Sequence, residues 1–175
     1  MSPESARAST LESLYLDDVI AHVVREFGTL RVETVDWPII LLEFPERRFG
    51  DAEFADALDY IERLLREGHL LGEKSFQVTD LTRMQEIAPA SQRKYVSEWA
   101  KRTLDLQKVA SVGAANVTPS SILRGLVTAV HLFQPPPTPT TFVSTRKEAW
   151  VVALKALDEA RAPLSPVVRA RLSAR

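Results

Sequence analysis

Cysteine is absent from the sequence, and histidine is scarce. Without cysteine the chain has no disulfides, no thiolate nucleophile and no cysteine-bound metal. The three histidines, His22, His69 and His131, are scattered along the chain, and none has carboxylates at the spacing of metal ligands. The sequence therefore predicts neither a metal site nor a bound cofactor.

Long apolar runs are also missing. No stretch comes near the roughly 18 apolar residues that a helix needs to cross a bilayer. The N-terminus lacks the basic segment followed by an apolar one that marks a secretory signal. From these two observations we expect a chain without a membrane span, located in the cytoplasm.

Neither sign of charge is in excess. Lys and Arg number 22 and Asp and Glu 23 among 175 residues, for a net charge of −1. This balance does not indicate a nucleic-acid partner. The exception is the segment 161–175, which has four arginines and no acid. We expect a basic C-terminal tail there, which either contacts an acidic partner or is a frayed chain end.

The sequence patterns of the common enzyme classes are missing as well. The chain has only six glycines and no glycine-rich phosphate loop, and no G-x-S-x-G motif presents a serine nucleophile. Carboxylate pairs such as Glu43 and Glu46 are most simply interpreted as solvated surface. No nucleophile, base and orienting group can be assembled from the pattern, so the sequence predicts a protein that is not an enzyme.

What the sequence does contain is an alternation of strand and helix patterns. After a loose start, a helical period covers 10–27, and two strand-like stretches follow at 30–37 and 39–44. An amphipathic helix begins at Asp51 and is expected to end at Gly68. Further strands are predicted at 74–81, 110–117 and 141–144, and further helices at 91–109, 120–133 and 146–160.

This order predicts an α/β fold. The sheet is expected to have about five strands, mostly parallel, and to open with an antiparallel hairpin. The predicted organisation is a flexible start with an extra N-terminal helix over 1–29, a domain over 30–160 and the basic tail over 161–175.

An ordered set of short motifs then resembles the SpoIIAA-like branch of the STAS family, including stand-alone bacterial proteins described as STAS/SEC14-like. The resemblance covers roughly 30–160. Its motifs are Ile39–Pro45 before the Asp51 helix, Phe76–Leu81 with its Asp-Leu ending, Ser91-Gln92-Arg93, Val117–Ser120, Leu123-Arg124-Gly125, Pro135–Pro137, Thr141–Val143 and Thr145–Trp150.

The resemblance implies a SpoIIAA-like fold and a regulatory module that acts by protein–protein interaction, as anti-sigma-factor antagonists do. In that family a partner kinase phosphorylates a serine at the start of the second helix, and the matching position here is Ser91. A helix N-terminus favours added negative charge. The local text Ala88–Arg93 lacks the Asp and Gly of the family's phosphorylation motif. An ordinary N-cap role for Ser91 is therefore the alternative.

A basic stripe is predicted on the helix over 91–109. Lys94, Lys101 and Lys108 recur every seven residues, with Arg102 beside them, opposite the predicted apolar side that includes Trp99. The stripe is either a surface for an acidic partner or a solvated helix face.

The segment 120–133 predicts a helix that is apolar nearly all round, with Arg124 as its only charged side chain. It must be covered by the N-terminal helix, by a second subunit in a homodimer, or by an apolar ligand. The last option gives the alternative function, a binder or sensor of a small apolar or nucleotide-like ligand in a pocket of roughly 300 Å³ or more. We also expect Asn116, Thr118 and Arg124 to lie beside Ser91 in a polar patch at the strand ends.

Overall fold

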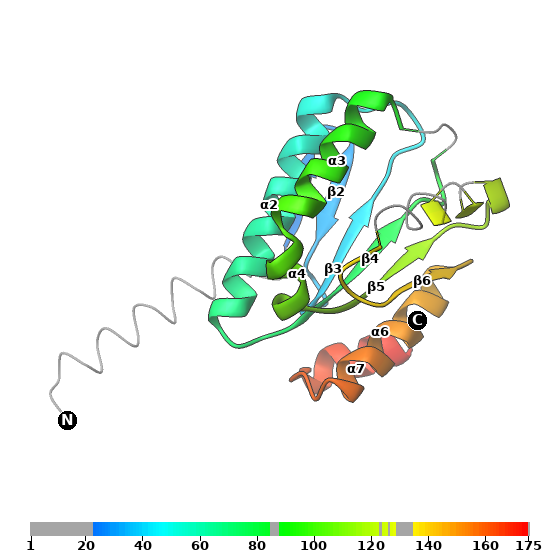
Figure 1. Ribbon diagram of the computed structural model, residues 1–175. Coiled ribbons are helices and arrows are strands. Elements are labelled where there is room, and N and C mark those ends of the chain that lie inside the picture. The colour runs from blue at the N-terminus through cyan, green and yellow to red at the C-terminus, as the bar shows by residue number, and fades with distance from the viewer. Residues whose placement is uncertain (1–22, 85–87, 123, 126, 129–134, 175) are drawn as a thin grey trace, which may run out of the picture.

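A computed structural model describes residues 23–84, 88–122, 124–125, 127–128 and 135–174 (Figure 1). The loose start and most of the helix expected over 10–27 lie outside these residues. The strands are β1 (Val24–Phe27), β2 (Leu30–Glu33), β3 (Ile39–Glu43), β4 (Ser75–Asp80), β5 (Ser111–Val117) and β6 (Thr140–Val143). The helices with stated bounds are α2 (Asp51–Leu70), α3 (Ala90–Arg102), α4 (Leu104–Ala110), α6 (Arg146–Glu159) and α7 (Pro166–Ser173).

The six strands form one sheet in the order β1-β2-β3-β4-β5-β6. The first three strands pair antiparallel, and β3 to β6 run parallel. The α/β class and the antiparallel opening of a mostly parallel sheet are thereby confirmed. The parallel strands end at the same edge, which places Glu43 of β3, Asp80 of β4 and Val117 of β5 side by side.

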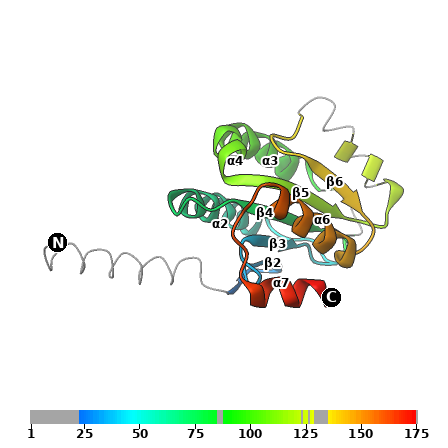
Figure 2. The same ribbon diagram turned by 90° about the horizontal axis from the view of Figure 1, so that it is seen from below.

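Helices cover both faces of this sheet (Figures 1 and 2). On one face, α2, α3 and α4 pack on a core that includes Val32, Leu42 and Leu64. On the other face, α6 and α7 pack on a second core that includes Phe76, Trp150 and Leu157. Burial of the two clusters supplies the main stabilising term of the fold.

Strand β1 corrects the predicted N-terminal helix. The spacing of Val23 and Phe27 fits a helix, but residues 24–27 are a strand that pairs with β2 through Phe27 and Leu30. Gly28 makes the turn possible because its φ of 59° is costly for a residue with a side chain. The alternation along this short edge strand is weak because most of its side chains are exposed.

Helix α2 follows its predicted apolar stripe but runs past Gly68. Gly68 sits against the indole of Trp37, where an added Cβ would come within 2.9 Å of Trp37 Cζ2. This glycine therefore serves close packing rather than helix termination. The chain turns at Gly72 instead, with a φ of 73°.

The helix predicted over 91–109 is two helices, α3 and α4, that meet at Thr103. Thr103 is fully buried, and its Oγ1 donates to the carbonyl of Trp99 at 2.8 Å. The same oxygen accepts a hydrogen bond from Gln107 Nε2 at 2.6 Å. A buried threonine that bonds back to the preceding turn bends the chain there, which the seven-residue spacing of the lysines does not reveal.

The segment after residue 160 is folded, so the expectation of a frayed basic tail is wrong. Val168 and Leu172 of α7 are buried in the second core. Arg169 donates to Asp158 of α6 at 3.0 Å, and Arg171 donates to Asp36 at 2.9 Å. Apolar residues four apart fix one side of α7, and its arginines pair within the chain.

Candidate functional site

An open groove lies at the carboxyl-terminal edge of β3, and its volume is about 570 Å³. Three segments surround it: the β1–β2 turn at Gly28 and Thr29, the stretch after β3, and the turn after β4. Arginines and glutamates face into it, namely Arg31, Arg47, Arg83, Glu26, Glu43 and Glu46. Open α/β sheets commonly bind ligands at this edge.

Beside the groove, Arg146 at the start of α6 connects the ends of two strands. Its guanidinium donates to Glu43 at the end of β3 and to Asp80 at the end of β4. The Asp80 side chain is only 3% exposed, and it also accepts from the amide and hydroxyl of Thr82 at 2.9 and 2.6 Å. Burial alone raises the pKa of Asp80, but the Thr82 hydrogen bonds and Arg146 outweigh burial and lower it.

A third carboxyl group adjoins this cluster. It belongs to Glu33 of β2, which shares the partner Arg31 with Glu43. Arg31 lies 3.0 Å from Glu33 Oε1 and 3.3 Å from Glu43 Oε2. Burial and the carboxyl group of Glu43 raise the pKa of Glu33, and Arg31 offsets only part of that rise. Glu33 thus lies in a cluster in which Arg31 and Arg146 both lower its pKa but do not cancel the effect of burial.

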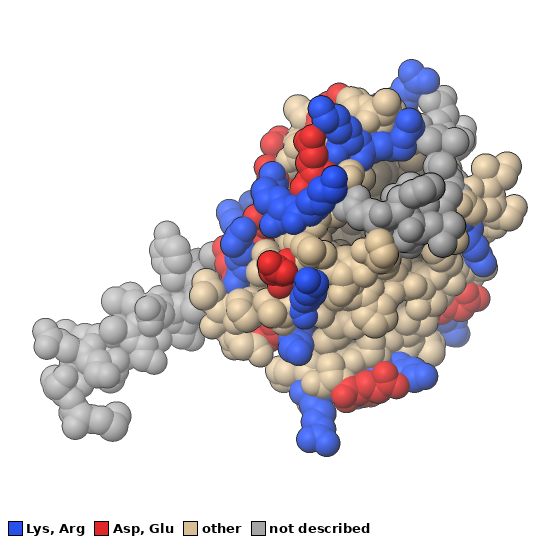
Figure 3. All heavy atoms as spheres, viewed as in Figure 1, with Lys and Arg blue, Asp and Glu red and all other residues tan. Residues whose placement is uncertain are grey.

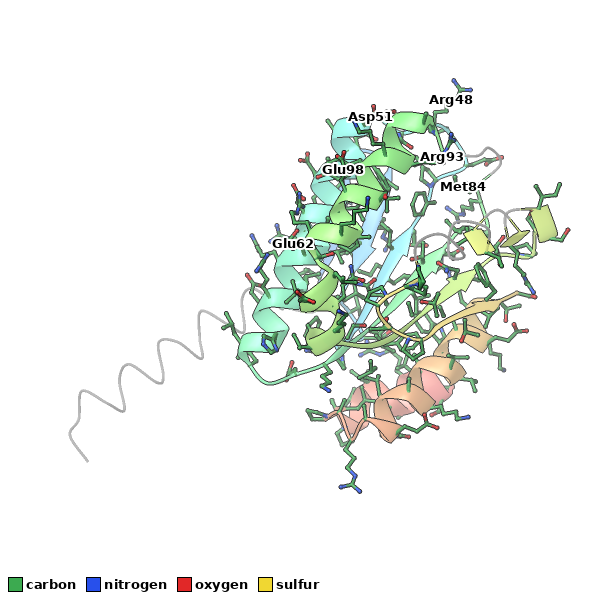
Figure 4. All side chains as sticks on the ribbon, in the orientation of Figure 1. Arg48, Asp51, Glu62, Met84, Arg93 and Glu98 are labelled. Carbon is green, nitrogen blue, oxygen red and sulfur yellow. The ribbon has the colours of Figure 1, made fainter. Side chains whose placement is uncertain are left out.

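The structure places Ser91 in the first turn of α3, where it is exposed. The N-cap is Pro89, so the alternative role of Ser91 as an N-cap is wrong. The first turn has neither an acidic residue nor a side-chain cap. Arg93 donates to the carbonyl of Ala88 at 2.6 Å, and it lies with Arg48 at one end of the molecule (Figure 4).

Lysines and arginines gather over α3 on the face shown in Figure 3. Lys94 and Lys101 are exposed, and Lys94 lies 3.8 Å from Glu98. Arg102 instead pairs with Asp59 and Glu62 of α2, and Lys108 of α4 pairs with Asp105. The predicted stripe is thus shortened, because Arg102 ties α3 to α2 and the break at Thr103 separates Lys108 from it.

Two members of the predicted polar patch meet. Arg124 donates to the carbonyl of Thr118 at 3.0 Å, and Thr118 is buried. Asn116 is half-buried on β5 between Thr79 and Phe142 of the neighbouring strands. In the part of the chain that the structure describes, no hydrogen bond or ion pair joins Ser91 to this group.

The described residues of the segment 120–133 are helical at 121–122, 124–125 and 127–128. Ile122 is 75% exposed, so burial on more than one side does not hold at this position. Val127 is half-buried. The remaining apolar residues of that expectation lie outside the described residues, namely Leu123, Leu126, Val130, Leu132 and Phe133.

The groove and the ion-pair cluster were not predicted as a site. The order of the strands, and the position of α6 after β6, bring together the charged residues of the cluster, namely Arg31, Glu33, Glu43, Asp80 and Arg146. The available signal was that Glu43 and Asp80 each end a predicted strand, and acids at the ends of neighbouring parallel strands meet at one sheet edge.

Metal sites and membrane spans can be assessed for the residues that the structure describes. Within them, no group of three or more His, Asp or Glu side chains is arranged to hold a metal ion. None of the helices in the same part of the chain is long and apolar enough to cross a membrane.

Comparisons with known proteins found no relative. No family model matches the chain, and neither the curated proteins nor the solved structures include a match.

Proposed function

We propose that the chain is a non-enzymatic regulatory module of STAS type that acts in the cytoplasm by binding another protein. The topology of the sheet supports this proposal, because the sheet begins with an antiparallel hairpin and its consecutive strands are neighbours. The charged groups at the strand ends also support it. Arg31 and Arg146 hold their carboxylates in ion pairs, an arrangement that suits a structural role.

The observation that carries the proposal is the exposed Ser91 hydroxyl in an uncapped first turn of α3. A phosphate there would interact favourably with the free N–H groups and the dipole of the helix. The cations of Arg93 and Lys94 are exposed in the same two turns. Phosphorylation would thus convert a basic surface into a mixed one and change its affinity for an acidic partner protein.

The alternative ligand-binding function has less support. It was expected to use a pocket beneath the helix that begins at 120, but none of the described residues of that segment lines the groove that we describe. The groove is lined by six charged side chains, which does not favour an apolar ligand.

The test begins with the protein purified from its own host. Native mass spectrometry and peptide mapping would measure subunit number, bound ligand and phosphate in one experiment. We expect a fraction with one added phosphate that maps to Ser91. A retained small molecule on every chain, without phosphate at Ser91, would instead favour the ligand-binding function.

The binding surface is tested by cross-linking in the host, followed by titration of the partner so identified. Lys94→Glu is expected to weaken binding about tenfold, through loss of one cation at the surface. Lys155→Glu is the matched control, since Lys155 on α6 also lies 3.8 Å from a glutamate four residues on. Ser91→Glu should change the affinity, and Ser165→Glu, at the exposed start of α7, should not. The proposal fails if every partner binds Lys94→Glu as tightly as Lys155→Glu and binds Ser91→Glu as tightly as Ser165→Glu.

A further inference from the structure

The groove at the end of β3 presents arginines from three separate segments. Arg31 comes from β2, Arg47 follows β3, and Arg83 follows β4. Arg48 and Met84, the chain neighbours of Arg47 and Arg83, lie toward the same end of the molecule in Figure 4. The volume of about 570 Å³ lies within the range of small-molecule sites.

Two of these arginines form no ion pair with an acid among the described residues. Arg47 and Arg83 are exposed, and within the described part of the chain neither forms an ion pair. Arg31 is held in place by Glu33 and Glu43, at 3.0 and 3.3 Å. The groove therefore combines one positioned guanidinium with two that can still bind an anion. Guanidinium groups match the geometry of phosphate oxygens through paired N–H donors.

The glutamates of the groove restrict the ligand further. Glu43 already forms ion pairs with Arg31 and Arg146, which compensate its charge. Glu26 and Glu46 also line the groove and are exposed. Carboxylates repel a bare anion but accept hydrogen bonds from hydroxyl groups. The lining thus favours a molecule with an anionic end and a hydroxyl-bearing body over a simple anion.

From these observations we infer that the groove is a binding site for a small phosphate ester of a polyhydroxylated molecule, with Arg47 and Arg83 on the phosphate. Glu26 contributes by accepting from a hydroxyl group of the ligand. None of the described residues of α3 lines this site, and the site does not depend on the proposed function.

The test is titration calorimetry on the full chain with ribose 5-phosphate, in about 0.15 M salt so that non-specific attraction is screened. We expect saturable binding to the wild type. Arg47→Gln with Arg83→Gln should weaken it at least about tenfold, because two charge-assisted contacts are lost. Glu26→Gln should narrow the preference for ribose 5-phosphate over inorganic phosphate.

Arg48→Gln is the matched control, because Arg48 is exposed and adjacent in sequence but does not line the groove. It should leave binding unchanged. Circular dichroism confirms that each variant is folded. The site is refuted by absence of saturable binding, by binding that survives the double substitution, or by equal loss in Arg48→Gln. Equal affinity for inorganic phosphate and ribose 5-phosphate would refute the assigned ligand class and show binding of an adventitious ion only.

Discussion

Two arginines of this protein each hold two carboxylates, in different surroundings. Arg102 connects α3 to Asp59 and Glu62 of α2, and its side chain is 50% exposed. Arg146 connects α6 to the ends of β3 and β4, and one of its partners, Asp80, is almost completely buried. Exposed ion pairs contribute little because water already solvates the charges, whereas removing one partner of a buried pair leaves an uncompensated charge. Burial therefore decides which cluster the fold depends on.

The largest effect is expected for Asp80→Ala. It leaves Arg146 with Glu43 alone and removes the acceptor for the amide and hydroxyl of Thr82. We expect a loss of about 3 kcal/mol in the free energy of unfolding, at the low end for a buried pair because Arg146 is 39% exposed. Urea unfolding measures it. Asp59→Ala makes the same change in the exposed cluster and should cost less than about 1 kcal/mol.

The pH dependence of the free energy of unfolding provides a second test of the role of Asp80. The folded state lowers the pKa of Asp80, so its stabilisation is present above the unfolded value of 3.8 and is lost as the pH falls through the folded pKa. The gap between wild type and Asp80→Ala should therefore close in acid. If the difference in stability between wild type and Asp80→Ala stays constant below the unfolded-state pKa of Asp80, the charge of Asp80 is not what stabilises the fold.

The sequence predicted the parts of this arrangement that depend on local pattern. An apolar run located β3, and strand-like stretches located β4 and β5, each to within two residues, while the spacing of Phe54, Leu58 and Ile61 located α2. Strand β1 was missed because Val23 and Phe27 suit a helix as well as a strand. Its state is decided by the Gly28 turn and by pairing with β2, and neither is a local preference.

The clusters were missed for a related reason. The charge of Arg102 was assigned to an outward stripe, since the spacing on one helix carries no information about the acids on α2. Arg146 lies 103 residues from Glu43 in the chain, so only strand order and the path of α6 bring them together. For the candidate sites, the exposure of Ser91 confirms only that it is accessible. Its phosphorylation stays a prediction.

Glu33→Gln is expected to change the free energy of unfolding less than Asp80→Ala does. The pH dependence of this change should be opposite to that for Asp80→Ala. Burial and Glu43 raise the pKa of Glu33 in the folded state, while Arg31 and Arg146 oppose the rise. A raised carboxyl pKa means that stability is lost as the pH rises from the unfolded value of 4.5 through the folded pKa. The glutamine variant cannot ionise, so its stability relative to wild type should increase across that window. Urea unfolding at a series of pH values measures the trend.

The control for this trend is Glu159→Gln, because Glu159 is exposed on α6 and its ion-pair partner is the exposed Lys155. We expect no comparable rise for that variant. If Glu33→Gln instead loses stability steadily as the pH rises, Glu33 is ionised in the fold and its main partner is Arg31.

The smallest effect is expected for Arg102→Ala. Glu62 keeps a second partner, since Arg66 Nη2 lies 2.6 Å from Glu62 Oε1, and Asp59 remains solvated and accepts from the Tyr95 hydroxyl at 3.1 Å. No buried charge is left alone, so the loss should be under about 1 kcal/mol. It should shrink further in about 0.5 M salt, because screening weakens exposed pairs, whereas the loss from Asp80→Ala should persist. If both variants responded to salt alike, the two arginines would lie in equivalent surroundings and exposure would not account for their difference.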